Sequence, residues 1–474
     1  MFSVHMAKLT LSILTVYLFV VVCSAQSSVS SPDEELIRLR NDWAVHFLEP
    51  EPHMELAKYF RDKGNLLQAF FILENARRGR FEQKIFDAAF LKYFGGSKPL
   101  DNSKSAEDRY IQLATSAPAD LEAVKHLADI YISREDYTNA KKYLSIALAA
   151  QPNDFDTLSA LVEIYERERN PDKAQQLLET FERRYPDSSG GLSLRLSKEM
   201  KADPVKARST AIEAIAKFPA EGEFRFNFGV LLQKENKLDE AEASFVKAAE
   251  LSPTSSYIQA WVGRFFFKAR PDNARALRYY LQSYLLDPHA YETEYVESRI
   301  PKLAFDLAQQ EFTKSIGLGL EPEKMLDDTN PIIVQLALLK IAEKWDSNKV
   351  DIFVRMMGHD EVRVRWFAMQ ALVEREGRAI DPKIRALLTD KDLRKRGLAA
   401  YMAVRLWKQE SFAEMRKMLA EEAQILRFDA VSALVMEGGG EGRLIVVKHK
   451  LSEPNATLRK LIDSATAAPN SSLK

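Results

Sequence analysis

The chain has 474 residues, which is too many for one compact core, so we expect several domains or a repeating architecture. Its 67 lysines and arginines balance 68 aspartates and glutamates, which excludes a global basic field that would attract nucleic acid or anionic membranes. With only 18 glycines and 19 prolines, the chain favours helices over the many tight turns of a β-sandwich.

The first 25 residues resemble a secretory signal peptide. Lys8 is their only charged residue, residues 9–22 are apolar apart from Thr and Ser, and small residues at Cys23 and Ala25 mark a cleavage site. We predict export to the periplasm or the extracellular space. The alternative is an uncleaved membrane anchor, although the apolar run is shorter than the roughly 20 residues that a bilayer span needs. Cys23 is the only cysteine, so the mature chain has no disulfide or thiol chemistry.

Residues 26–49 are predicted to form a lead segment followed by one capping helix. Ser31-Pro32-Asp33-Glu34 matches a capping box with proline at the first helical position, and the helix should run to about Phe47. We expect this helix to cover the exposed end of the repeats that follow it.

Residues 50–290 repeat with a period near 34. A proline closes each segment at intervals of 34, 34, 33, 34 and 35 residues, and an alanine lies twelve residues before each proline. A large residue follows most of these alanines by four positions, so small and large side chains share one helix face and a second helix can interlock with it. The prolines are Pro118, Pro152, Pro186, Pro219, Pro253 and Pro288.

This pattern resembles the tetratricopeptide repeat, a unit of two antiparallel helices. It accounts for about seven units, of which the first lacks its closing proline and the one from Ser188 is degenerate. The resemblance implies a solenoid in which each unit touches only its neighbours along the chain.

Residues 291–329 are predicted to be a helical junction, and residues 330–465 repeat with a period of 31. Ala337, Ala368, Ala399 and Ala430 keep this interval, and arginines at 365, 396 and 427 lie three residues before the last three alanines. The segment resembles HEAT-type repeats. We expect the arginines to be structural, bonding acids or carbonyls of neighbouring repeats. Residues 466–474 are predicted to be a flexible tail.

The predicted fold is therefore all-α: an α-solenoid of about seven tetratricopeptide-like helix pairs followed by four to five HEAT-like helix pairs. Catalytic motifs are missing from the sequence. None of the seven histidines lies within four residues of another, and the Gly438–Gly440 cluster lacks the Lys-Ser/Thr of a phosphate loop. We predict no catalytic residues, no metal site and no cofactor.

The tetratricopeptide resemblance implies a partner-binding groove lined by defined positions of each first helix. That groove would be mixed, acidic in its middle and aromatic with arginine towards its end. The alternative for the aromatic residues is that they pack between adjacent units. The predicted groove residues are Lys125, Asp129, Ser159, Glu163, Glu223, Phe226, Arg264 and Phe267.

The leading functional hypothesis is an exported, non-enzymatic scaffold that binds a protein or peptide partner on the concave face of the solenoid. A membrane-anchored assembly or tethering factor for a multiprotein complex is the alternative, and an enzyme with an unrecognised site is a remote one. No nucleic-acid partner is expected, and a membrane is expected only if the N-terminal segment stays attached.

Overall fold

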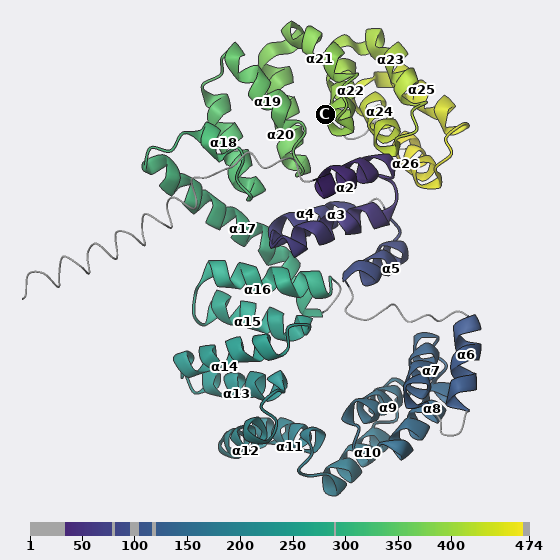
Figure 1. The fold of residues 1–474 in the computed structure, drawn as a ribbon, viewed down its shortest axis with the longest axis vertical. Coiled ribbons are helices and arrows are strands. Elements are labelled where there is room, and N and C mark those ends of the chain that lie inside the picture. The colour runs from purple at the N-terminus through teal and green to yellow at the C-terminus, as the bar shows by residue number, and fades with distance from the viewer. Residues whose placement is uncertain (1–33, 78–80, 95–103, 116–119, 289–290, 468–474) are drawn as a thin grey trace, which may run out of the picture. The chain divides into compact units, whose positions relative to one another are not determined.

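The computed structural model describes residues 34–77, 81–94, 104–115, 120–288 and 291–467 (Figure 1). Every regular element in these ranges is a helix and none is a strand, so the predicted all-helical class is confirmed for them. The predicted signal peptide and residues 468–474 of the predicted tail lie outside the described residues. Within the described ranges, no helix combines the length and apolar character that crossing a bilayer requires.

The chain divides into two compact units, which do not follow the predicted domain boundaries. The smaller unit combines residues 1–59 with residues 388–474, and the larger unit comprises residues 60–387. Helix α3 (Pro50–Asp62) crosses the boundary between them. The predicted segment of period 31 is therefore shared between the two units.

The larger unit begins with a series of helix pairs. Their bounds are α4 (Leu66–Arg77), α5 (Gln83–Phe94), α6 (Lys104–Ala114), α7 (Leu121–Ser133), α8 (Tyr137–Ala150), α9 (Phe155–Arg167), α10 (Pro171–Arg184), α11 (Ser189–Ala202), α12 (Pro204–Lys217), α13 (Gly222–Lys234), α14 (Leu238–Leu251), α15 (Ser256–Lys268) and α16 (Asn273–Leu286). The long α17 (Tyr291–Gly317) follows, then α18 (Pro331–Glu343), α19 (Val350–Met356), α20 (Val362–Glu376) and α21 (Asp381–Leu387).

Within each pair from α7 to α16, small residues of one helix receive large residues of the other. A Cβ added to Gly229 of α13 would lie 2.9 Å from the Phe245 ring of α14, and one added to Gly263 of α15 would lie 2.6 Å from the Tyr280 ring of α16. Such distances leave no room for a methyl group, so the glycines permit the close approach of the two helices. In these two pairs, the alternation of small and large residues in the sequence thus determines how closely the two helices pack.

The turns of the α7–α8, α9–α10 and α13–α14 pairs share one backbone conformation at equivalent positions. Glu135, Arg169 and Asn236 each have a φ of 59°, the left-handed conformation that ends a helix and reverses the chain. Asp136 and Asn170 then cap the second helix, accepting hydrogen bonds from backbone amides three residues further on.

The helix pairs of the larger unit do not touch only their neighbours along the chain. Helix α4, from the first predicted repeat, packs against α16, from the last. The Phe70 and Tyr284 rings lie 4.8 Å apart, and the Tyr284 hydroxyl donates a hydrogen bond to the buried Glu74. The expectation of purely neighbouring contacts is therefore wrong for this unit, because a buried polar and aromatic contact joins residues 210 positions apart.

The smaller unit contains α2 (Glu34–Val45), α22 (Leu393–Trp407), α23 (Phe412–Met418), α24 (Gln424–Glu437), α25 (Gly439–Lys450) and α26 (Ala456–Ala467). Helix α2 packs on α22 and α24. Just after α2, the Phe47 and Phe428 rings lie 5.1 Å apart, and Gln424 accepts a hydrogen bond from the Leu48 amide at 2.7 Å. The predicted capping helix thus packs on the C-terminal helices α22 and α24, and its Trp43 ring also contacts His53 of α3, at the start of the predicted 34-residue repeats, with the ring centroids 5.7 Å apart.

The arginines spaced along the C-terminal helices hold the loops that precede them. Arg365 donates to the carbonyls of His359 and Asp360 at 2.7 and 2.8 Å. Arg427 and Arg459 repeat this arrangement with the carbonyls five and six residues before them, whereas Arg396 bonds the Leu388 carbonyl and Glu421. Their predicted structural role is confirmed, and the resemblance to HEAT-type repeats stays a prediction.

Candidate functional site

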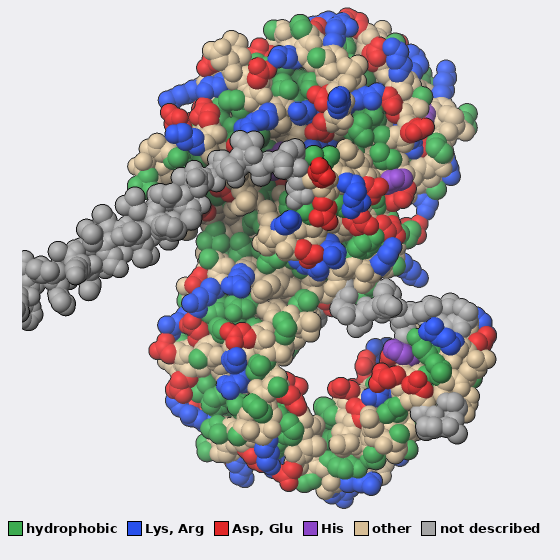
Figure 2. Space-filling view, in the orientation of Figure 1, with side chains coloured by type: hydrophobic (Ala, Val, Ile, Leu, Met, Phe, Trp, Pro, Cys, Tyr) green, Lys and Arg blue, Asp and Glu red, His purple; other side chains and the backbone are tan. Residues whose placement is uncertain are grey.

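The eight predicted groove residues all lie on first helices of their pairs: two each on α7, α9, α13 and α15. We call the solvent-facing residues of α7, α9, α11, α13 and α15 the inner surface. Figure 2 shows acidic side chains gathered where α7 and α9 border a hollow. The contacts below show which of the predicted residues this surface brings together.

Lys125 on α7 is held by the start of the next first helix. Its Nζ lies 2.8 Å from Oδ2 of Asp154, the residue that caps α9. The hydrogen bond to Asp154 raises the pKa of Lys125, so the lysine stays charged. Because its charge is neutralised and its motion restricted, Lys125 ties two repeats together and is not a free cation for a partner.

Glu223 on α13 lies in an acidic part of the inner surface. Desolvation raises the pKa of Glu223, and the nearby carboxylates of Glu221 and Asp156 raise it further. The Ser193 hydroxyl of α11 donates a hydrogen bond to Glu223 at 3.2 Å, which partly opposes this rise. Among the described residues, no lysine or arginine pairs with Glu223 or with Asp156 on α9. The inner surface therefore carries negative charge that the fold itself leaves uncompensated.

Asp129 on α7 has the same character. Its side chain is exposed to solvent, yet desolvation by the surrounding protein raises the pKa of Asp129, and His126 partly opposes this effect. No cation of the described residues pairs with it. A group whose charged form is penalised before binding gains more from meeting a cationic partner than a fully hydrated carboxylate does.

Ser159 and Glu163 on α9 contribute less. Glu163 pairs with Arg167 one turn along the same helix at 2.6 Å, and both side chains are more than half exposed. Such a surface pair is worth less than about 1 kcal/mol and can reorganise to meet a partner. Ser159 lies one turn before Glu163 on the same helix and is half-buried.

Phe226 on α13 is buried, with only 6% of its surface exposed. Its ring packs at 5.8 Å from Phe245, 5.5 Å from Tyr257 and 5.9 Å from Trp261. This geometry fits the alternative in which the aromatic residues pack between adjacent units. Phe226 therefore supports the inner surface from below, while Tyr257, at 48% exposed, presents the aromatic face to solvent.

Of the two predicted residues on α15, Arg264 is available at the surface and Phe267 packs inward. The Arg264 guanidinium lies over the Trp261 ring at 4.9 Å, and among the described residues no carboxylate pairs with it. Phe267 instead packs inward, 6.5 Å from the Tyr280 ring and with the Arg299 guanidinium 5.0 Å above it. Arg264 stays available at the surface, whereas Phe267 connects α15 to α16 and α17.

Sequence reasoning missed Trp261 and Ser193. Trp261 lies four residues after Tyr257 and three before Arg264, a spacing that places all three on one helix face, so the signal was present. Ser193 belongs to the degenerate repeat, whose departures from the pattern hid the register of α11. The described residues include no cluster of histidine, cysteine or carboxylate side chains that could hold a metal ion.

Family models for the tetratricopeptide repeat match residues 131–195 and 222–255. The matched segments run from the end of α7 into α11 and across α13 and α14. These two segments therefore match tetratricopeptide repeats, in the region where the spacing of alanines and prolines predicts them. No curated protein sequence matches the chain.

Several solved structures resemble parts of the chain. The MamA protein is 18% identical, with 40% of this chain and 97% of that chain covered and a TM-score of 0.23. YrrB, described as a TPR protein with an unusual peptide-binding site, is 15% identical, covering 55% and 97% at a TM-score of 0.18. A human IFIT1 dimer with PPP-AAAA is 15% identical, covering 85% and 96% at a TM-score of 0.30.

Proposed function

We propose that this chain is a non-enzymatic scaffold that holds a protein or peptide partner on its inner surface. The observation that carries the proposal is the set of carboxylates at Asp129, Asp156 and Glu223, which lie on three different first helices and form no ion pair among the described residues. Folding brings Asp156 and Glu223 close enough for their charges to interact, although they belong to different repeats. A surface of this kind complements a cationic ligand.

The partner segment proposed here carries lysine or arginine side chains followed by an apolar or aromatic residue. Its cations would face the carboxylates of α7, α9 and α13, and its apolar residue would pack beside Tyr257. Desolvation by the protein raises the pKa values of Asp129 and Glu223, so their charged forms are less well solvated than free carboxylates and are stabilised when a cation arrives. Because the charges remain partly exposed, affinity should fall as salt rises.

Binding of a mixed peptide library to the full chain tests this proposal. We expect enrichment of basic peptides, and a loss of affinity of about tenfold when Asp156→Asn and Glu223→Gln are combined. Glu240→Gln on the second helix α14 is the matched control, since it removes an exposed carboxylate outside the inner surface. Basic peptides that bind the double variant as tightly as the unchanged chain, or an equal loss in the control, would refute the assignment.

Export is a separate part of the proposal, and it rests on the signal-like character of residues 1–25. We infer that this segment is removed and that the scaffold works in the periplasm or outside the cell. N-terminal sequencing of the protein from its native compartment tests this inference. A mature chain starting at Gln26 supports it. A chain that keeps residues 9–22 and stays with the membrane fraction favours the alternative, a membrane-anchored assembly or tethering factor.

A further inference from the structure

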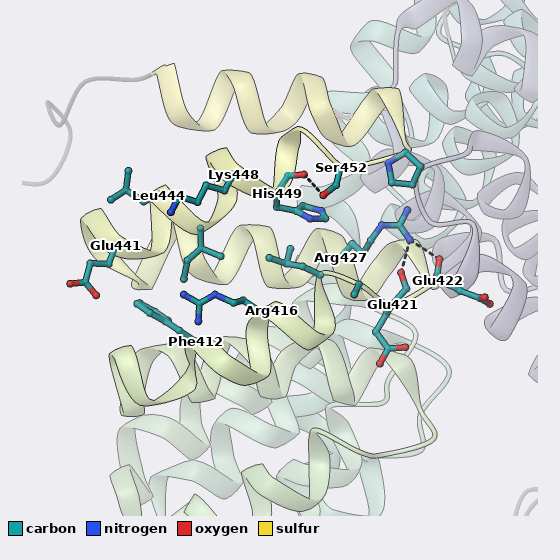
Figure 3. Close-up of a pocket in the computed structure, with 14 residues that line it drawn as sticks. Phe412, Arg416, Glu421, Glu422, Arg427, Glu441, Leu444, Lys448, His449 and Ser452 are labelled. Carbon is teal, nitrogen blue, oxygen red and sulfur yellow. Dashed lines mark hydrogen bonds between the residues drawn. The ribbon is translucent and has the colours of Figure 1, made fainter.

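The smaller unit contains a pocket of about 870 Å³ between α23, α24 and α25 (Figure 3). Its walls combine charged and apolar side chains. Among the apolar ones, Phe412 and Leu419 belong to the α23 side, and Leu444 and Ile445 belong to α25. The pocket opens to solvent along the helices, so it has the form of a groove between two helices.

Two cations from the facing helices enter this space. Figure 3 shows Arg416 of α23 and Lys448 of α25 projecting into the same gap, with Phe412 below and Leu444 above. Among the described residues, neither side chain forms an ion pair. The adjacent cation Lys417, in contrast, pairs with Glu414 at 2.9 Å. Both side chains are exposed to solvent, so each is free to pair with an anion that enters the gap between the two helices.

The remaining cations of the pocket serve the fold. Arg427 pairs with the fully buried Glu453 at 3.0 Å, and His449 reaches the same carboxylate at 2.8 Å. Although burial works against the charged form of Glu453, hydrogen bonds led by that from His449 hold its pKa below the ordinary value. This group fixes α24 against the loop before α26, so the pocket has a rigid inner end. Arg416 and Lys448 are therefore its available charges.

An apolar stripe extends the groove beyond the pocket. Leu444, Val447 and Leu451 are 61%, 47% and 92% exposed. Their spacing of three and four residues places them on one side of α25, directly beside the pocket wall that Leu444 forms. Exposed aliphatic side chains in such a row commonly mark a surface that is covered by a partner. Val447 and Leu451 lie outside the pocket lining, so the apolar surface continues past the pocket and suits a segment of chain better than a small molecule.

We propose that this groove, formed by the pocket and the stripe of α25, binds an acidic amphipathic segment of a protein. Carboxylates of the segment lie between Arg416 and Lys448, and its apolar residues cover Leu444 and Val447. An anionic membrane fits the surface poorly, because Glu421, Glu422 and Glu441 stand at the rim and would repel a continuous sheet of negative charge. This groove is separate from the inner surface of the larger unit, and it selects the opposite charge.

The test uses the full chain and a pooled library of peptides of about 12 residues, long enough to follow α25 for about 18 Å as a helix. Each peptide carries acidic and aliphatic residues, and a second pool replaces every acidic residue by lysine. Vesicles of phosphatidylcholine with phosphatidylserine form a third probe. The variants are Arg416→Glu with Lys448→Glu, and Lys417→Glu as the matched control on the same helix.

We expect the chain to enrich acidic peptides with affinities that fall by about tenfold or more in the double variant and stay unchanged in Lys417→Glu. Asp156→Asn with Glu223→Gln should leave this binding intact, which separates the groove from the inner surface. The proposal is overturned if the affinity for acidic peptides is the same in the double variant as in the unchanged chain. It is also overturned if vesicle binding, and not peptide binding, is lost in the double variant, since the groove would then recognise lipid.

Discussion

Replacing Arg427 by methionine should destabilise the C-terminal helices more than any other single change of a surface-loop contact. Arg427 donates to the carbonyls of Glu421 and Glu422 at 2.8 and 2.7 Å and to both carboxylate oxygens of Glu453. Methionine keeps much of the apolar stem and none of the donors. The loop before α24 and the carboxylate of Glu453 would lose their shared partner together.

The size of the effect follows from burial. The Arg427 side chain is 8% exposed and the Glu453 side chain is 0% exposed, so the change leaves a buried carboxylate with weaker compensation. Removing one partner of a buried ion pair costs about 3–5 kcal/mol. His449 and the Asn455 amide still bond Glu453, so we expect the lower end of that range, about 3 kcal/mol.

Hydrogen exchange of the α24 and α25 amides measures this loss directly, because two compact units need not unfold in one step. A loss of about 3 kcal/mol corresponds to roughly a hundredfold faster exchange through local opening. Arg416→Met is the control: Arg416 is exposed and lacks an ion pair among the described residues, so its removal should change exchange less than about threefold.

Adding Glu453→Gln to Arg427→Met should recover part of the loss, because the unpaired buried charge is then gone. Amide hydrogen exchange that is as slow in Arg427→Met as in the control would refute the reasoning. The hydrogen bonds of Arg427 would then contribute no more to stability than the bonds to water that replace them on unfolding. Failure of Glu453→Gln to recover any stability would show that the carbonyl bonds, and not the carboxylate, account for the effect.

Three further predictions concern the larger unit. Gly263→Ala should lower its stability by about 1–3 kcal/mol and its melting temperature accordingly, because the added methyl meets the Tyr280 ring at 2.6 Å; an unchanged melting temperature would mean that the ring moves freely. The hydrogen bond from Arg134 helps hold the pKa of Glu107 at about 2. The contribution of Glu107 to stability is therefore full above pH 4.5 and declines as the pH falls towards 2. Glu107→Gln should flatten this part of the pH profile of stability, measured by denaturant unfolding. The pKa of Glu223 is raised by desolvation, so the charge of Glu223 opposes folding above its ordinary pKa. Glu223→Gln should therefore stabilise the unit at neutral pH while weakening the binding of basic peptides. The same variant should have no stabilising effect at pH values below about 4.

The helix pairs could be predicted because their information is local. Ala241, Phe245 and Pro253 fall within a dozen residues of one another, and their spacing alone places two side chains on one helix face and ends the helix after them. The arginine contacts were equally accessible, since Arg365 and Arg427 bond carbonyls only five and six residues away. Short-range geometry of this kind repeats wherever the residue pattern repeats.

The candidate site was predictable in its position and less so in its details. The first-helix positions of the repeat pattern include Glu223, which is exposed, and Arg264, which is half-buried, and their part in binding stays a prediction. Whether a side chain on that surface is exposed depends on the size of its neighbours in the next repeat. Phe226 is covered by Tyr257 and Trp261 of α15, and no pattern within its own helix could show this.

The sequence by itself determined the helices, their turns and their pairing, because each depends on residues within about one repeat of each other. Only the tertiary structure decided that α4 packs on α16 and that α2 packs on α22 and α24. These contacts join surfaces that are far apart in the chain, and an apolar helix face specifies that it must be buried without specifying which other face will cover it. The same reason explains why the α25 groove emerged only from the folded chain: its two cations come from separate helices, and their lack of partners is a property of the assembled unit.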